Sequence, residues 1–139
     1  MALFKICRMD IQKLIPQQPP FVFVDRIYDI SDTFFRSEFS IGEKSLLTRN
    51  GCFSEAGLVE HVAQSMAAYI GYHNQDNVRV GVVAAVENFT FSTLPVCGEN
   101  IQTEITILNK VFDISHVKSV TYSNGKIIAE GRMKLVERV

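Results

Sequence analysis

The stretch Ser54-Glu-Ala-Gly-Leu-Val-Glu-His-Val-Ala-Gln-Ser-Met-Ala-Ala-Tyr-Ile-Gly-Tyr72 decides the fold. Ser54 is a typical N-cap residue, and Glu55 suits the first turn because a negative charge there interacts favourably with the helix dipole. Apolar residues then recur at helical spacing: Leu58, Val59, Val62, Ala63, Met66, Ala67 and Ile70. The pattern predicts one helix from about residue 55 to 72, which ends before the polar run 74–77.

Segments with strand patterns surround this helix. Before it, residues 21–30 are rich in aromatic and β-branched residues, and residues 33–41 alternate between apolar and polar. Residues 42–51 are polar and irregular, so we expect a loop there.

After the helix, four further strands are predicted at residues 78–92, 101–111, 112–122 and 126–136. Ser123-Asn-Gly125 favours a tight hairpin between the last two, because Asn-Gly tolerates the positive φ of a type I′ turn. In the last strand, one face is predicted to carry Ile127, Ala129, Gly131, Met133 and Leu135. Strands gathered around a single apolar helix predict an α+β fold, in which an antiparallel sheet wraps around the helix and buries it.

Composition limits the classes of function. The 139 residues are 47% hydrophobic, which suits one globular domain over residues 1–139. The net charge is −1 and no element concentrates basic residues, so nothing indicates nucleic-acid binding. Residues 1–10 are interrupted by charges, unlike a signal peptide or a membrane span.

The cysteines also point away from disulfide and metal chemistry. Cys7, Cys52 and Cys97 are odd in number and far apart, so neither a disulfide framework nor a metal site is expected. We interpret each as a small buried hydrophobic residue of a reduced, cytoplasmic protein, and we expect no cofactor.

Four stretches, in the same order, resemble motifs of the β-hydroxyacyl-(acyl-carrier-protein) dehydratases, which have the hotdog fold. The stretches are Ile15-Pro-Gln-Gln-Pro-Pro-Phe-Val-Phe-Val-Asp-Arg-Ile27, Gly57-Leu-Val-Glu-His-Val-Ala-Gln64, Phe89-Thr-Phe-Ser-Thr-Leu-Pro-Val-Cys-Gly-Glu99 and Ser123-Asn-Gly-Lys-Ile-Ile-Ala-Glu130. They are similar, respectively, to the family's Pro-Phe-Leu-Leu-Val-Asp-Arg strand, its helix with Glu before Ala-Gln, its Pro-Val-x-Pro-Gly-Asp turn and its last hairpin. Each motif is short, so their common order carries the resemblance.

The resemblance implies an acyl thioester substrate, carried by acyl carrier protein or coenzyme A. It also implies a homodimer or higher homo-oligomer, with each active site at a subunit interface and at the end of an acyl tunnel. In the family, a helix carboxylate, matched here by Glu60, acts with a His of the neighbouring subunit. That His belongs to a Gly-His-Phe-Pro segment, but the matching residues 42–54 contain neither His nor Pro, and Gln17 and Gln18 replace a His-Arg pair.

Dehydration of a 3-hydroxyacyl thioester needs a base for the α-proton, an acid for the leaving hydroxyl and donors for the thioester oxygen. Glu60 and Gln64 are the candidate catalytic residues. We expect the first turn of the helix to offer free N–H groups to the thioester oxygen, from Ala56 and Gly57 and as far as Leu58. The aromatic residues that we consider for the acyl tunnel are Phe21, Phe23, Phe89 and Phe91.

Other interpretations of these residues remain open. Glu60 can act as both base and acid through a water, or one of His61, His73 and His116 can replace the missing His. Alternatively, Glu60, His61, Gln64 and Ser65 share an arc of about 140° that resembles an ordinary solvated helix face. The neighbouring Asp25 and Arg26 are expected to form a structural salt bridge at a strand edge.

Three functions therefore compete. The first is a 3-hydroxyacyl-(acyl-carrier-protein) dehydratase of fatty-acid or polyene-type synthesis. The second is an acyl thioesterase, in which the helix carboxylate directs water at the thioester carbonyl. The third is a non-catalytic, acyl-binding partner of a catalytic paralogue, which the missing His favours.

Overall fold

The computed structural model describes residues 11–74 and 80–138, so Cys7 lies outside the described residues. Its helices are the short 3₁₀ helix η1 (Ile11–Lys13) and the long helix α2 (Glu55–His73). Its strands are β1 (Arg26–Tyr28), β2 (Phe34–Ser40), β3 (Thr48–Arg49), β4 (Cys52–Phe53), β5 (Val80–Phe91), β6 (Asn100–Val111), β7 (Ile114–Ser123) and β8 (Lys126–Arg138).

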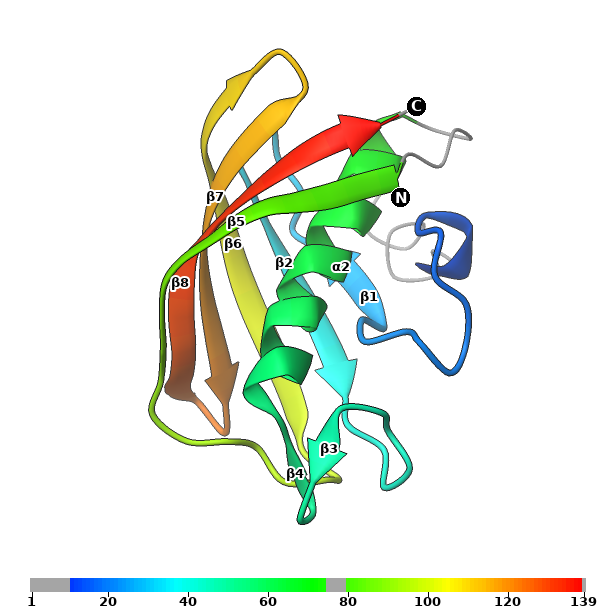
Figure 1. Cartoon of the computed structure of the whole chain (residues 1–139), viewed down its shortest axis with the longest axis vertical. Helices are drawn as coiled ribbons and strands as arrows, with labels where there is room; N and C mark the ends of the chain where they lie inside the picture. Colours follow the sequence, from blue (N-terminus) through cyan, green and yellow to red (C-terminus); the bar gives the residue numbers. More distant parts are fainter. Residues whose placement is uncertain (1–10, 75–79, 139) are drawn as a thin grey trace.

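Six strands form one antiparallel sheet in the order β1-β2-β6-β7-β8-β5, while β3 and β4 form a small separate hairpin. The sheet curls around α2, with β1 on one side of the helix and β5 on the other (Figure 1). The predicted architecture, an antiparallel sheet wrapped around one long helix, is confirmed.

Helix α2 begins and ends as its sequence predicts. The Ser54 hydroxyl accepts a hydrogen bond from the Gly57 N–H at 3.1 Å, which caps the first turn. At the other end, the Asn74 side chain donates to the carbonyl of Ile70 at 2.8 Å. Every residue from 61 to 71 is buried, so this part of the helix has no solvated face.

The core consists of two apolar clusters separated by a layer of polar side chains. Along β2, Phe35 and Phe39 belong to different clusters and Ser37 lies between them; Ile105, Thr103 and Ile101 repeat this order along β6. We call the intervening side chains the polar layer: Ser37, His61, Ser65, Thr103 and Thr121, all buried. The hydroxyls of Ser65 and Ser37 lie 2.8 Å apart, so α2 and the sheet meet through hydrogen bonds at this level.

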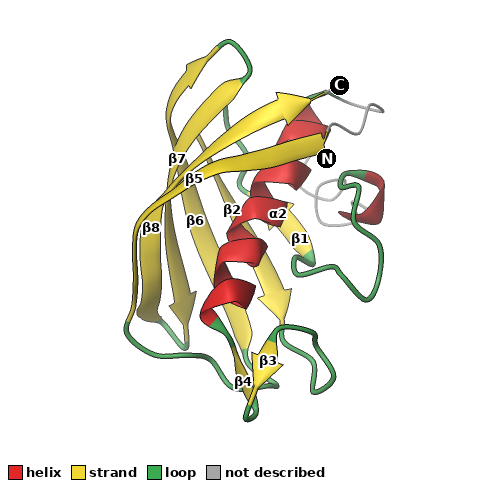
Figure 2. Cartoon of the chain, viewed as in Figure 1, coloured by secondary structure: helices red, strands yellow, loops and turns green. Residues whose placement is uncertain are grey.

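The structure corrects three local predictions. The strand expected over residues 21–30 shrinks to β1, and Figure 2 shows the chain reaching it through a long loop. The loop expected over residues 42–51 contributes the two residues of β3. Ile127 was predicted to face the core but is 50% exposed, because a register shift between Thr121 and Tyr122 makes Ile128 buried instead.

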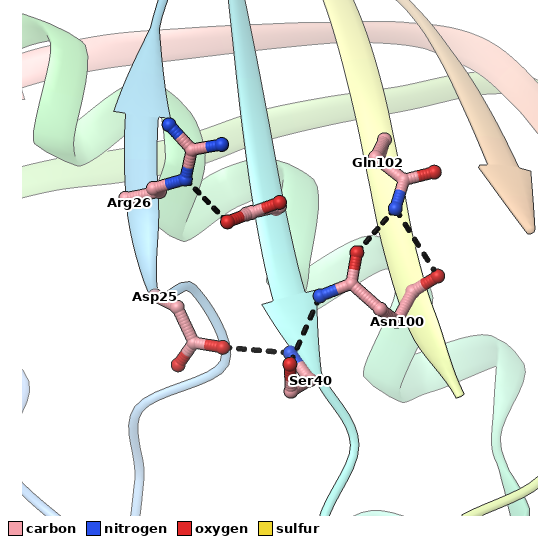
Figure 3. A network of polar contacts seen from close by, with 6 residues as sticks. Asp25, Arg26, Ser40, Asn100 and Gln102 are labelled. Carbon is pink, nitrogen blue, oxygen red and sulfur yellow. Dashed lines mark hydrogen bonds and ion pairs between the residues drawn. The ribbon is translucent and has the colours of Figure 1, made fainter. Parts of the chain in front are cut away.

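Asp25 and Arg26 connect β1 to its neighbours. The Asp25 carboxylate accepts a hydrogen bond from the Ser40 N–H at 2.6 Å, and the Ser40 hydroxyl accepts one from the Asn100 amide (Figure 3). Arg26 forms an ion pair with Glu38 across β1 and β2. Both residues therefore act at a strand edge, as predicted, but these contacts are made with β2.

Candidate functional site

Glu60 and Gln64 lie one turn apart on α2, with their side chains in contact. The Gln64 amide nitrogen Nε2 donates to the Glu60 carboxylate oxygen Oε1 at 3.2 Å. Gln64 is 1% exposed and Glu60 is half-buried, so the pair connects the protein interior to its surface. The alternative that these residues form an ordinary solvated face is wrong, because His61 and Ser65 are buried as well.

The loop before β1 fixes the orientation of the Gln64 amide. Its Oε1 accepts the N–H of Phe23 at 2.7 Å, and its Nε2 also donates to the carbonyl of Phe21 at 2.8 Å. Because a backbone N–H only donates and a carbonyl only accepts, the amide cannot be reversed. Gln64 therefore presents N–H, never C=O, to Glu60. These bonds also explain why residues 21–25 are irregular, since the helix side chain takes the place of a strand partner.

Glu60 and Gln64 border a cavity of about 450 Å³, within the range of small-molecule sites. The cavity is lined by Gln17, Phe21, Phe23, Leu46, Leu47, Ala56, Glu60 and Gln64. Its rim is apolar and open to solvent, with Phe21 59% exposed. The Gln17 Oε1 atom is buried and has no hydrogen-bond partner among the described residues. Such a site suits an apolar group with a polar end.

Five of the eight predicted site residues meet at this cavity: Phe21, Phe23, Ala56, Glu60 and Gln64. Phe89 and Phe91 do not line it; they lie on β5, where Phe89 packs against one core cluster and Phe91 against the other. Gly57 does not line it either. A Cβ at this glycine would lie 2.6 Å from the ring of Phe53, so the ring covers it.

The helix start differs from the prediction of free N–H groups at positions 56 to 58. Gly57 N–H donates to the Ser54 hydroxyl and Leu58 N–H to the Ser54 carbonyl, at 3.1 and 3.0 Å. Among the described residues, no acceptor lies opposite the N–H of Ala56, which also lines the cavity. Ala56 is therefore the one position of the three with an N–H available to a thioester oxygen.

No histidine side chain from the described residues reaches this cavity. His61 points into the polar layer, where Nδ1 lies 2.7 Å from the Phe23 carbonyl oxygen and Nε2 lies 2.9 Å from the Thr103 hydroxyl. Burial lowers the pKa of His61 to about 4, although its bond to Phe23 acts in the opposite direction. His116 Nε2 lies within hydrogen-bond distance of the Glu87 carboxylate at 3.0 Å, and His73 lies at the far end of α2.

Three lining residues were not predicted: Gln17, Leu46 and Leu47. Leu46 and Leu47 form an apolar pair inside a polar loop. Because they are far from Glu60 along the chain, the sequence does not indicate that they line the same cavity. Among the described residues, no three histidine, cysteine or acidic side chains could hold a metal ion together. No helix in the described part of the chain is long and apolar enough to span a membrane.

Comparisons with known proteins identify the family of the chain. Residues 9–138 match the ApeP-like family, described as ApeP dehydratase. The chain is 25% identical over 131 residues to the 3-hydroxyacyl-(acyl-carrier-protein) dehydratase FabZ of Halalkalibacterium halodurans, covering 87% of this chain and 91% of the relative.

Two solved structures show the shared fold. The dehydratase heterocomplex ApeI:P from Xenorhabdus doucetiae superimposes with a TM-score of 0.84 at 13% identity, covering 94% of this chain and 92% of that one. A hypothetical thioesterase with coenzyme A from Streptococcus pneumoniae has a TM-score of 0.64 at 10% identity, covering 81% and 84%. The hotdog fold predicted from the sequence is thereby confirmed. Because the family match spans almost the whole chain, this protein belongs to the ApeP-like family of dehydratases.

Proposed function

We propose that the chain dehydrates 3-hydroxyacyl thioesters, with Glu60 as its acid–base group. The observation that carries the proposal is the Glu60–Gln64 pair, hydrogen-bonded at 3.2 Å, at the edge of an apolar cavity. Family membership gives the reaction class, and the cavity lining gives the substrate class. Only Glu60 among the lining residues carries a charge, so the cavity suits an acyl chain.

In this reaction, the C2–H proton is removed, the C3–O bond breaks, a C2–C3 double bond forms and water leaves. Glu60 takes the proton at C2 or delivers one to the hydroxyl leaving C3. Gln64 orients the carboxylate by donating to its Oε1. The N–H of Ala56 is the candidate donor to the thioester oxygen, which gains charge as the proton leaves. The FabZ relative is named for a substrate on acyl carrier protein, so we propose that carrier over coenzyme A.

We propose that a second hotdog chain completes the site by pairing along β5. This strand is one of the two edges of the sheet, the longer one, and it carries exposed Val83 and Val86, 38% and 48% accessible. Their partners on β8, Leu135 and Met133, are buried on the face that α2 covers. A long, apolar, unpaired edge is a template for another strand. The second chain is either an identical copy or a paralogue, as in the ApeI:P heterocomplex.

A non-catalytic role is the second candidate. It is favoured by one observation: no His from the described residues lies at the cavity. In that case the chain holds an acyl group beside Glu60 while a catalytic paralogue performs the dehydration. Thioester hydrolysis has only the shared fold in its favour.

One assay separates these functions. The purified chain is incubated with a 3-hydroxyacyl thioester, and both enoyl thioester and free thiol are followed. If the chain is a dehydratase, the wild type forms enoyl product and Glu60→Gln forms it at least about 100-fold more slowly. Glu43→Gln, the same substitution in an exposed loop, serves as the control and should retain the wild-type rate. Free thiol would indicate hydrolysis instead. The absence of both products, from the chain alone and from the chain combined with a paralogue, would refute the enzyme hypotheses for that substrate.

A mixing experiment tests whether Glu60 acts across an interface. The chain is combined with a hotdog dehydratase that keeps its His but has lost its own helix Glu. Recovery of enoyl formation with wild type, and not with Glu60→Gln, supports a shared site. If neither mixture recovers activity although the two chains co-purify, the shared site is excluded.

We also propose that residues 1–139 form one hotdog domain and that the protein is cytoplasmic. The free thiols of Cys52 and Cys97 support a reducing compartment.

A further inference from the structure

The buried His61 makes two hydrogen bonds whose directions can be assigned. Nδ1 lies 2.7 Å from the Phe23 carbonyl oxygen, which only accepts, so Nδ1 carries the proton. Burial lowers the pKa of His61, so the ring is neutral and Nε2 accepts from the Thr103 hydroxyl. Thr103 has then used its only proton, so the Thr121 hydroxyl donates to it at 2.8 Å. The ring is therefore held as the Nδ1–H tautomer.

Phe23 is consequently held by α2 at both of its backbone polar groups. Its N–H donates to Gln64 Oε1 at 2.7 Å, and its C=O accepts from His61 Nδ1. The same Gln64 amide donates to Glu60. If Phe23 shifted, Gln64 Oε1 would lose its donor, and only the Nε2 bonds to the Phe21 carbonyl and to Glu60 would still orient the amide.

We infer that His61 is a positioning residue: it fixes the backbone of Phe23 and thereby keeps the Gln64 amide donating to Glu60. The inference rests on the proposed dehydration only for its consequence in turnover. The hydrogen-bond partners of the ring are a backbone carbonyl and a threonine hydroxyl, and the Phe39 ring stacks on it with centroids 6.2 Å apart; none of these three groups carries a charge. The ring holds the Phe23 carbonyl and the Thr103 hydroxyl by hydrogen bonds between uncharged groups.

Two substitutions of similar size separate the two ends of the ring. His61→Asn keeps an N–H donor close to the position of Nδ1, facing Phe23. His61→Gln carries its amide one bond further out, toward Thr103, and loses the donor at the Nδ1 position. Both remove the imidazole and keep an amide, so general loss of the ring affects them equally.

The first readout is backbone amide hydrogen exchange at Phe23, which needs no activity. We expect strong protection in wild type and His61→Asn, and protection reduced by about tenfold or more in His61→Gln. Equal protection in both variants, or the reverse order, would overturn the inference.

The second readout is turnover of a 3-hydroxyacyl thioester. We expect kcat to fall by about 10- to 100-fold in His61→Gln with KM nearly unchanged, and to recover in His61→Asn. Equal kcat values in the two variants would contradict the positioning role. If even the wild type is inactive, the proposed function fails, and exchange at Phe23 alone decides whether His61 holds that backbone.

Discussion

Gln64 donates to Glu60 across 3.2 Å, and it can present only its N–H groups there because its own oxygen faces the N–H of Phe23. A loop that belongs neither to the helix nor to a strand thus determines what the candidate catalytic carboxylate meets. The position of that loop is as important to the site as the helix that carries Glu60.

Replacing Gln64 should therefore affect both stability and activity. Gln64→Leu leaves the Phe23 N–H and the Phe21 carbonyl without their partners, which should lower the free energy of unfolding by about 3 kcal/mol. Urea denaturation measures this loss, and the exposed Gln18→Leu serves as the control, with almost no change expected. Comparable losses in both variants would show that Gln64 has no special structural role.

His61 should make the protein sensitive to acid. Its pKa is about 4 in the folded state, against about 6.5 in an unfolded chain, so between these values only the unfolded state binds the proton. The stabilisation is complete above about pH 6.5 and is lost as the pH falls toward 4, by up to about 3 kcal/mol. Urea denaturation of wild type and His61→Asn across this range tests it. Parallel stability curves would argue against a buried neutral imidazole.

Gly71 should be intolerant of alanine although it lies inside a helix. Alanine usually stabilises a helix interior by about 1 kcal/mol relative to glycine. A Cβ at Gly71, however, would lie 2.3 Å from the backbone carbonyl oxygen of Leu14, so Gly71→Ala should destabilise the protein by about 1–3 kcal/mol. Thermal denaturation gives the sign. Gly42→Ala, with nothing within 4 Å of the new Cβ, should be nearly neutral.

A charged side chain introduced on β5 should leave the single chain folded but should prevent two chains from associating along this strand. Val86 is 48% exposed on this edge strand, so Val86→Lys should leave the fold intact and prevent strand pairing. Light scattering coupled to size-exclusion chromatography should report a mass reduced to that of one chain. Val111→Lys, at an equally exposed valine next to the β6–β7 turn, should keep the wild-type mass. An unchanged mass for Val86→Lys would place the interface elsewhere.

The sequence predicted those features that depend on short-range patterns. The spacing of Leu58, Val62 and Met66 predicted α2, and Asn124-Gly125 predicted the last hairpin, where both residues have positive φ. Prediction failed where distant segments compete. The regular alternation of residues 127–135 predicts a buried Ile127, but the register shift between β7 and β8 leaves this residue exposed. No spacing rule in the sequence encodes such a shift.

The candidate site divides in the same way. A short motif on one helix carries both Glu60 and Gln64, so the sequence predicts this pair together. The apolar pair of Leu46 and Leu47 reaches the cavity through the long loop between β2 and α2, a placement that depends on tertiary packing. His61 was considered as a catalytic replacement, whereas its burial in the polar layer could be seen only once β6 and β7 were in place.

The polar layer has one more consequence, for the axial position of α2. If only apolar clusters joined α2 to the sheet, the helix could shift along its axis, because one aliphatic contact can replace another with little loss of free energy. A displacement of one turn, about 5.4 Å, would instead move either His61 or Ser65 out of the polar layer and against aliphatic side chains, and would leave the buried hydroxyl of Ser37 or Thr103 without its partner on the helix. The buried hydroxyls and imidazole thus fix the axial position of α2 relative to the sheet. Because Glu60 lies on the same helix, this position also determines where its carboxylate lies beside the cavity.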